Sequence, residues 1–369
     1  GLVMAGRMGN HWGLGMLANA GDCVDCDSGD AADRLGFVTP LLGHIFAAAY
    51  DFSATGPTST RRDSARTLDL EPTDDVRSVT FAVMRWKDDL SRDRRRKAGK
   101  TTFEYGAYLS HRWQQNDIPA SYLDPAASPT VMARGFKTTA VDGWARLTLP
   151  TARIEAEAAL MLAEIEQSSL VPGALLRETV ESRQLGLAVE SDFGAPEAPF
   201  GFGLDFGWAS GDPAPGFGVY PPMNGEKPQA GDLDGMQADP PRDNRVDNFR
   251  FHSDYRIDRI LFREIIGAVT DAVYLRPHLR WRIAQAGPGV VVAQFAAIGS
   301  FAQYASSTPG GARPLGIELD PTLRYESRDG FDAALEYAFL LPLSGLDNPD
   351  AGLDAKPAQL LRLRLAYLF

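Results

Sequence analysis

Apolar residues recur at every second position over many stretches of this chain, and this alternation is the feature that most restricts its fold. The C-terminal stretch shows it most clearly, with apolar side chains at Leu361, Leu363, Leu365, Tyr367 and Phe369. Arg362 and Arg364 lie between them. A two-residue period puts successive side chains on opposite faces of a β-strand. The pattern therefore predicts strands with one apolar and one polar face.

The same alternation recurs along the whole chain and predicts an all-β protein. We expect about fourteen strands, with a two-residue hairpin at Pro150 and Thr151. The expected ranges are 1–8, 34–39, 43–53, 75–87, 100–114, 135–149, 152–166, 179–191, 197–210, 269–284, 289–304, 313–327, 330–342 and 358–369.

Residues 152–166 test this interpretation, because they are rich in good helix formers. Their alternation nevertheless favours a strand. The hairpin would place Arg146 opposite Glu155 and Trp144 opposite Glu157. Opposite charges that face each other across a ladder support this register.

Composition narrows the class of protein further. The 369 residues have a mean hydropathy of −0.20 and a net charge of −11, and no apolar run approaches the ~18 residues that a membrane-spanning helix requires. A helical membrane protein is therefore excluded, whereas a soluble protein and a β-barrel both remain, since the two faces of barrel strands average to a soluble composition. The acidic balance argues against general nucleic-acid binding.

Four cationic side chains occupy one face of the strand expected over residues 269–284. They are Arg276, His278, Arg280 and Arg282, and they alternate with apolar residues. A row of cations on one strand face requires contact with water, and the lumen of a membrane barrel provides it. We therefore predict a transmembrane antiparallel up-and-down β-barrel.

The connections between strands agree with this architecture. Long and short links alternate, as expected when extracellular loops are long and periplasmic turns are short. This pattern depends on assigning residues 211–268 as one long loop, either extracellular or folded into the lumen. An additional strand over 246–258 would reverse the long and short sides for the rest of the chain.

Several motifs extend the comparison beyond the barrel class. They are R-M-G-N-H-W-G-L-G-M-L-A-N-A-G-D-C-V-D-C-D, G-W-A-S-G-D-P-A-P-G-F-G, S-T-P-G-G and D-G-F. The chain resembles a little-characterised family of predicted outer-membrane barrel proteins of myxobacteria and their relatives. In that family further strand-like sequence precedes the first motif, so the resemblance implies a native count of sixteen or more strands. It implies no substrate.

The two cysteines, Cys23 and Cys26, stand in the sequence C-V-D-C among aspartates. On an exported loop we expect a local disulfide between them. Zinc would need further sulfur or nitrogen ligands, for which His11 is the nearby candidate. Calcium is an alternative, but Gly29 stands where the EF-hand template requires a ligand. We therefore expect no metal site.

Catalytic signatures are weak. Ser210, in A-S-G-D, lacks the strand-turn-helix frame of a hydrolase nucleophile. The glycine run at 201–207 is not followed by a predicted helix, so it is not a dinucleotide fingerprint. We expect neither an enzyme nor a cofactor.

The expected pore lining combines both signs of charge. It comprises Arg276, His278, Arg280, Arg282, Arg362, Arg364, Glu104, Asp142, Arg146, Glu155, Glu157 and Asp205. Opposed acidic and basic walls would create a transverse field that selects among ions. Alternatively, the charges pair across strands and serve the fold.

The sequence thus predicts a single barrel domain over residues 1–369, in the bacterial outer membrane. Its expected function is passive diffusion of small polar or charged solutes through a narrow bore. The alternative is a structural or adhesive surface barrel with a plugged lumen and ligand-binding extracellular loops. Expected partners are outer-membrane lipid, lipopolysaccharide and small polar solutes, without nucleic acid. The apolar faces leave the oligomeric state open, because lipid and a second subunit would contact similar surfaces.

Overall fold

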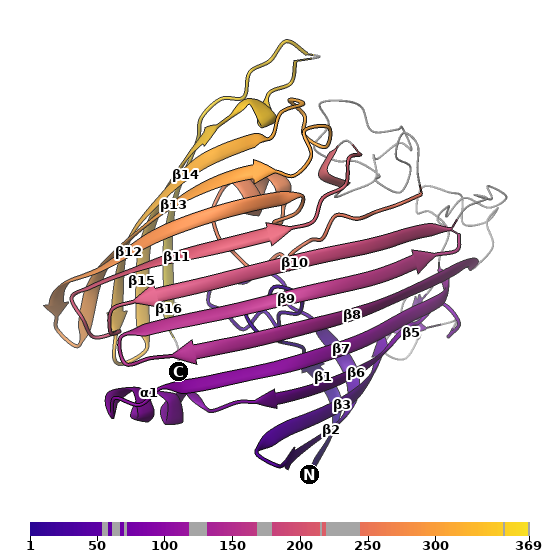
Figure 1. Cartoon of the computed structure of the whole chain (residues 1–369), viewed down its shortest axis with the longest axis horizontal. Coiled ribbons are helices and arrows are strands. Elements are labelled where there is room, and N and C mark those ends of the chain that lie inside the picture. The colour runs from indigo at the N-terminus through magenta and orange to yellow at the C-terminus, as the bar shows by residue number, and fades with distance from the viewer. Residues whose placement is uncertain are drawn as a thin grey trace.

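A computed structural model describes residues 1–53, 58–60, 67–69, 72–117, 131–167, 179–214, 216–218, 244–349 and 351–367. Fourteen strands form one antiparallel sheet in which each strand pairs with the next one along the chain, and a separate hairpin, β4–β5, lies outside it (Figure 1). This is the predicted up-and-down topology, and it is confirmed.

The strands of the large sheet are β1 (Leu2–Gly9), β2 (Ala31–Leu41), β3 (His44–Ser53), β6 (Val76–Arg85), β7 (Thr102–Asp117), β8 (Met132–Thr148), β9 (Ala152–Ile165), β10 (Val180–Phe193), β11 (Phe200–Ala209), β12 (Ala272–Ala286), β13 (Gly289–Ala302), β14 (Pro314–Ser327), β15 (Phe331–Pro342) and β16 (Ala358–Tyr367). The small hairpin consists of β4 (Thr58–Thr60) and β5 (Thr67–Asp69). The helical segments are α1 (Asp89–Lys97), the π-helical turn η2 (Leu261–Ile266) and the 3-10 turns η1 (Gly216–Gly218) and η3 (Ser344–Leu346).

Each of the fourteen expected strands coincides with one strand of the sheet. The helix-forming stretch at 152–166 is the strand β9. Its register with β8 pairs Arg146 with Glu155 and Trp144 with Glu157, as predicted. Alternation therefore outweighed helix propensity here, because tertiary pairing commonly overrides a weak intrinsic preference.

Helix α1 was not anticipated within the short link at 88–99. Its local signals are nevertheless clear, since the Asp88 side chain accepts a hydrogen bond from the Ser91 backbone N–H at 2.8 Å and so caps the first turn. Basic residues fill the last turn, where they interact favourably with the helix dipole. The link contains a helix, although the two strands that it joins, β6 and β7, are direct neighbours in the sheet.

The sheet has two different ends. Short turns such as 149–151 and 287–288 lie at one end, and long links such as 10–30 and 210–271 lie at the other. The ladders run in sequence from β1 to β16, and within the described ranges no ladder joins those two strands. None of the described helices is long and apolar enough to cross a membrane.

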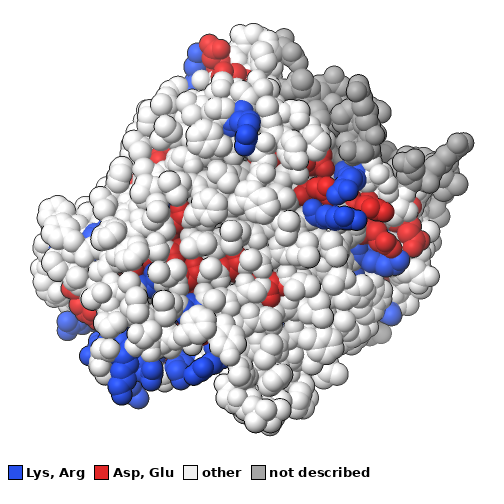
Figure 2. All heavy atoms as spheres, viewed as in Figure 1, with Lys and Arg blue, Asp and Glu red and all other residues white. Residues whose placement is uncertain are grey.

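Large apolar side chains cover the outer face of the sheet. Exposed examples are Phe37, Phe81, Phe103, Leu162, Phe202, Leu279, Phe301, Leu323, Leu335 and Leu363. Uncharged atoms dominate the view of this wall in Figure 2, whereas Lys and Arg gather at the lower left, where α1 lies in Figure 1. An apolar surface this extensive is not compatible with water. The wall faces lipid, as in the β-barrels of bacterial outer membranes.

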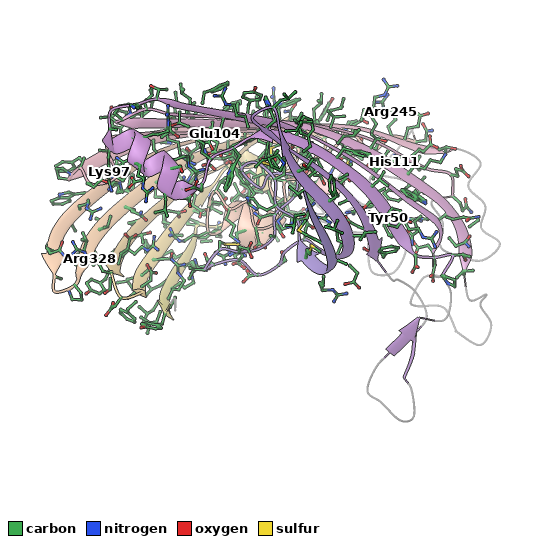
Figure 3. The ribbon with its side chains drawn as sticks, turned by 90° about the horizontal axis from the view of Figure 1, so that it is seen from below. Tyr50, Lys97, Glu104, His111, Arg245 and Arg328 are labelled. Carbon is green, nitrogen blue, oxygen red and sulfur yellow. A yellow bond between two sulfur atoms is a disulfide. The ribbon has the colours of Figure 1, made fainter. Side chains whose placement is uncertain are left out.

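The main core lies on the concave side of the sheet. It contains side chains from links as well as strands, among them Met16, Phe249, Phe251 and Leu261, which are buried. Figure 3 shows the sheet curving around these segments. The expected water-filled lumen therefore does not hold for this part of the interior, because links from the long-loop end fold back into it.

Candidate functional site

Two segments from the long-loop end occupy the interior, and we name them the N-terminal insert (residues 10–30) and the central insert (residues 244–271). Phe249 and Phe251 of the central insert are 0% and 1% exposed. The π-helical turn η2 also lies within the central insert. Part of the long loop predicted at 211–268 thus folds inward, while residues 219–243 lie outside the described residues.

Wall carboxylates hold both inserts through backbone hydrogen bonds. Glu157 on β9 accepts bonds from the backbone N–H groups of Leu14 and Leu17, at 2.5 and 3.1 Å. Glu318 on β14 accepts bonds from three consecutive N–H groups of the central insert, at 2.9 to 3.0 Å, donated by Arg259, Ile260 and Leu261. Buried N–H groups require acceptors, so these carboxylates connect each insert to the wall.

Small wall residues make room for the insert side chains. A Cβ atom on Gly186 of β10 would lie 2.4 Å from the Phe249 ring. Ala188, Ala209 and Ala296 line the same core. Wall and central insert are therefore complementary in shape, as expected of a closely packed interior.

The two inserts are also bound to each other. The Asp254 carboxylate accepts hydrogen bonds from the backbone N–H groups of Asp27 and Ser28, at 3.0 and 2.9 Å. The Met16 carbonyl accepts a bond from the His252 backbone N–H at 2.7 Å. The interior segments thus form one connected unit.

Asp25 links this unit to the last strand. Its carboxylate contacts the guanidinium groups of Arg263 and Arg362, each at 2.7 Å. Burial disfavours the charged form, but the hydrogen bonds from the two arginines outweigh that effect and lower the pKa of Asp25 from 3.8 to about 2. Asp25 stands between Cys23 and Cys26, which are joined by a disulfide.

The predicted acidic pore residues on β7 to β9 point inward but contact protein rather than water. Glu104 is fully buried and binds Arg146 at 3.0 Å. Asp142 accepts a bond from Trp12 Nε1 at 2.9 Å. Glu155 and Glu157 are also buried, and Glu155 accepts bonds from Trp144 at 2.7 Å and Arg153 at 2.6 Å. These residues, with Arg146, do not line an open pore here, because cross-strand partners and the N-terminal insert cover them.

The arginines of the last strand are likewise paired. Arg362 binds Glu336 at 2.7 Å in addition to Asp25, and Arg364 lies 3.6 Å from Glu336. Their charges therefore join β16 to β15 and to the N-terminal insert.

The cations of β12 have a different environment. Arg276 binds Asp205 of β11 at 2.6 Å, and His278 Nε2 lies 3.4 Å from the same carboxylate. Arg280 and Arg282, nearer the turn, instead donate to the backbone carbonyl of Pro196, at 2.7 and 3.0 Å. The positive charge of β12 is thus less covered toward the short-turn end.

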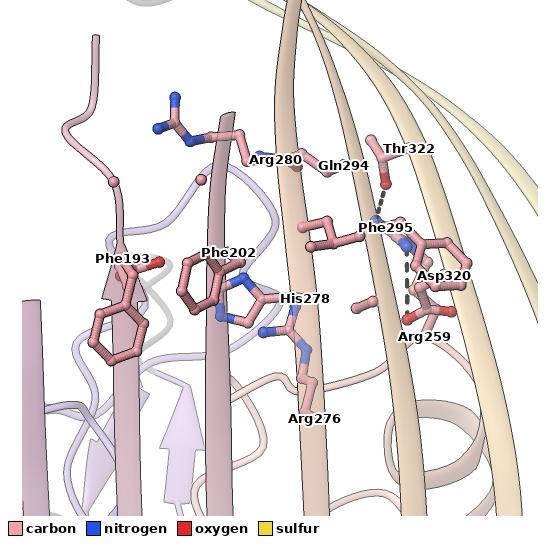
Figure 4. Close-up of a pocket in the computed structure, with 15 residues that line it drawn as sticks. Phe193, Phe202, Arg259, Arg276, His278, Arg280, Gln294, Phe295, Asp320 and Thr322 are labelled. Carbon is pink, nitrogen blue, oxygen red and sulfur yellow. Dashed lines mark hydrogen bonds and ion pairs between the residues drawn. The ribbon is translucent and has the colours of Figure 1, made fainter. Parts of the chain in front are cut away.

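A polar cavity of about 260 Å³ lies beside these cations, and we name it the vestibule. Its lining includes Arg276, His278 and Arg280 of β12 together with Arg259 of the central insert and Asp320 of β14. In Figure 4 these side chains come from separate strands and from the insert and surround one space. A second cavity, of about 380 Å³, includes His11, Cys23, Cys26, Glu190 and Tyr255 in its lining. The insert segment around Tyr255 to Arg259 therefore borders both cavities.

Within the ranges described, no cluster of three or more His, Cys, Asp or Glu side chains is arranged to hold a metal ion.

Two solved structures provide a comparison. The beta domain of the Bordetella autotransporter BrkA aligns over 82% of this chain and 94% of its own, with 12% identity and a TM-score of 0.25. The Pseudomonas putida toluene transporter TodX aligns over 85% of this chain and 78% of its own, with 11% identity and a TM-score of 0.26. No family model and no curated protein matches the chain. The barrel architecture depends on the strand order and the two faces of the wall, and the myxobacterial resemblance stays a prediction.

The residues that close the interior were not identified from the sequence. The role of Glu318 depends on three N–H groups that approach it from a distant link. One signal was present: half of residues 249–266 are large and apolar, and the inward positions near Gly186 are small. Together these features indicate an insert that occupies space inside the wall.

Proposed function

We propose that this protein is a gated outer-membrane channel for small polar solutes, closed at rest by the two inserts. It has no enzymatic role in this proposal. The observation that carries it is the position of the central insert inside the wall, where it borders two cavities and Glu318 holds its backbone. Passage requires the insert to move.

The nature of the contacts supports movement rather than permanent closure. Near the vestibule the insert meets the wall through charged groups, including Arg259 with Glu336 at 3.2 Å and with Asp320 at 3.7 Å. Charged groups can exchange protein partners for water at a modest net cost, because an ion pair contributes little more than the hydration it replaces. A buried apolar side chain that is exposed to water gains no comparable interaction in place of the contacts it loses.

The direct test is conductance of the purified protein in planar bilayers. We expect the wild-type protein to be closed most of the time and Glu318→Ala to open in frequent discrete steps, because three buried N–H groups lose their acceptor at a cost of roughly 1–3 kcal/mol each. Glu326→Ala is the matched control: Glu326 lies on the same strand and pairs at 2.9 Å with Arg324 of that strand. It should conduct as the wild-type protein does.

Two results would contradict gating. A steady, large wild-type conductance would mean that the interior is open, and folded Glu318→Ala protein as silent as the wild type would favour a permanently closed barrel. If Glu318→Ala does not fold, Glu157→Ala makes the same test at the N-terminal insert.

A structural or adhesive barrel is the second candidate. The main apolar core of the described chain combines the wall with the central insert, as expected if the insert mainly stabilises the fold. In that case every variant above would be silent, and binding would occur at the long-loop end.

A further inference from the structure

We propose that the vestibule binds a small organic carboxylate on Arg280. This inference rests on the proposed function, since it names the class of solute that enters the channel from the short-turn end. It also makes a claim that is independent of gating, because the vestibule is present while the inserts are in place.

The strand register leaves Arg280 without a facing carboxylate. Its cross-strand partners are Gly201 on β11 and Gln294 on β13. By contrast, Arg276 faces Asp205, which binds it at 2.6 Å. Arg276 is therefore neutralised by a carboxylate. Arg280, on the same face of β12 and four residues further along, is not.

Glycines on β11 make room for the side chains of His278 and Arg280 on β12. A Cβ atom at Gly203 would lie 2.3 Å from the His278 ring, and one at Gly201 would lie 3.0 Å from an Arg280 nitrogen. Any larger residue at Gly203 would displace the His278 ring. The glycines of β11 therefore leave room for the His278 and Arg280 side chains that border the vestibule.

The hydrogen bonds of Arg280 hold it in place without neutralising it. It donates to the carbonyls of Ala195 and Pro196, at 3.0 and 2.7 Å. Two backbone carbonyls fix the direction of the guanidinium plane but carry no net charge. Arginine retains donors that suit a carboxylate, because its planar fork presents five N–H groups.

Other groups around the vestibule favour an anion with polar substituents. The lining contains three guanidinium groups, from Arg259, Arg276 and Arg280, and two carboxylates, from Asp192 and Asp320. Asp192 already binds Arg153 at 3.1 Å. Within the described residues the Nε atoms of Arg259 and Arg276 are buried and have no hydrogen-bond partner.

Titration calorimetry of the whole protein in detergent micelles, at constant ionic strength, tests the site. The probes are succinate, its neutral analogue succinamide and inorganic phosphate. We expect succinate to bind and succinamide not to bind, with phosphate weaker than succinate. Phosphate binding tighter than succinate would overturn the assignment to carboxylates.

Two variants locate the site. Arg280→Gln removes the cation, and Gln294→Glu places an internal carboxylate directly opposite it; each should weaken succinate binding at least tenfold. Arg328→Gln, in the turn before β15 and outside the vestibule lining, removes one cation from the same end and is the matched control. Absence of wild-type binding, or unchanged binding in both vestibule variants, would overturn the proposal.

The result is separable from gating. Succinate binding together with silent bilayers would leave the carboxylate site in place and contradict the channel. Conductance without succinate binding would contradict the site alone.

Discussion

The two halves of the barrel interior are built from different residues. In the filled half, insert side chains such as Phe249 pack against Gly186 and Ala188 of the wall. In the hollow half, around the vestibule, Arg280 faces Gly201, and Arg259 of the central insert borders a cavity instead of filling it. Small wall residues occur in both halves, so small residues alone do not indicate whether an interior is open.

The difference between the halves lies in what occupies the space beside the small residues. Moving an aromatic ring of the central insert out of water lowers the free energy of the folded protein. A guanidinium group loses its hydration when it is buried, so an unpaired one stays beside a cavity. Stability should therefore depend mainly on the filled half, and solute selection on the hollow half. Three predictions test this division, from the largest expected effect to the smallest.

The largest effect should come from Phe249→Ala. The ring is fully buried, and its removal leaves a cavity that costs about 3–4 kcal/mol of unfolding free energy. Denaturant unfolding of the protein in lipid vesicles measures this loss. Phe301→Ala, on the outer face with 47% exposure, is the matched control and should cost much less. Equal losses of unfolding free energy in the two variants would show that stability does not depend mainly on the filled half.

An intermediate effect should follow acidification. The folded pKa of Asp25 is lowered from 3.8 to about 2, so its contribution to stability is complete above about pH 4 and is lost as the pH falls toward 2. The expected loss is ~1 kcal/mol after allowance for solvent screening. Thermal unfolding across this pH range measures it, and Asp25→Asn should remove part of the pH dependence. An unchanged profile in that variant would mean that Asp25 does not link the inserts to β16.

The smallest effect on stability should come from Arg280→Gln. Within the described part of the chain its guanidinium donates only to turn carbonyls, so we expect a change under ~0.5 kcal/mol. In the channel that we propose, the same variant should shift the reversal potential away from anion preference. A large loss of stability would mean that Arg280 mainly stabilises the fold and does not mainly bind a solute.

The strands and their two faces could be predicted from the sequence, because apolar and polar residues alternate within each strand. Leu279 and Arg280 are adjacent, and their difference in polarity already assigns one to the outer face and the other to the inner face. The pairing of Arg146 with Glu155 followed from a two-residue turn. Helix α1 was not predicted, because its capping signals lie within a short link between two strands.

The contacts of the interior were harder to predict from the sequence, because they join residues far apart in the chain. The expected pore residue Glu157 instead accepts hydrogen bonds from the N-terminal insert, and nothing near position 157 indicates that donor. The expectation of opposed charged walls was likewise incomplete, since most acids of β7 to β9 pair locally or with the inserts.

The sequence by itself determined the strands, their two faces, the hairpin register and the alternation of long and short links, because a two-residue period is a local property of the backbone. Only the tertiary structure decided which lumen charges stay uncovered and which links fill the interior. Those outcomes depend on the packing of distant segments, where a buried N–H group must find an acceptor and an apolar ring must find space.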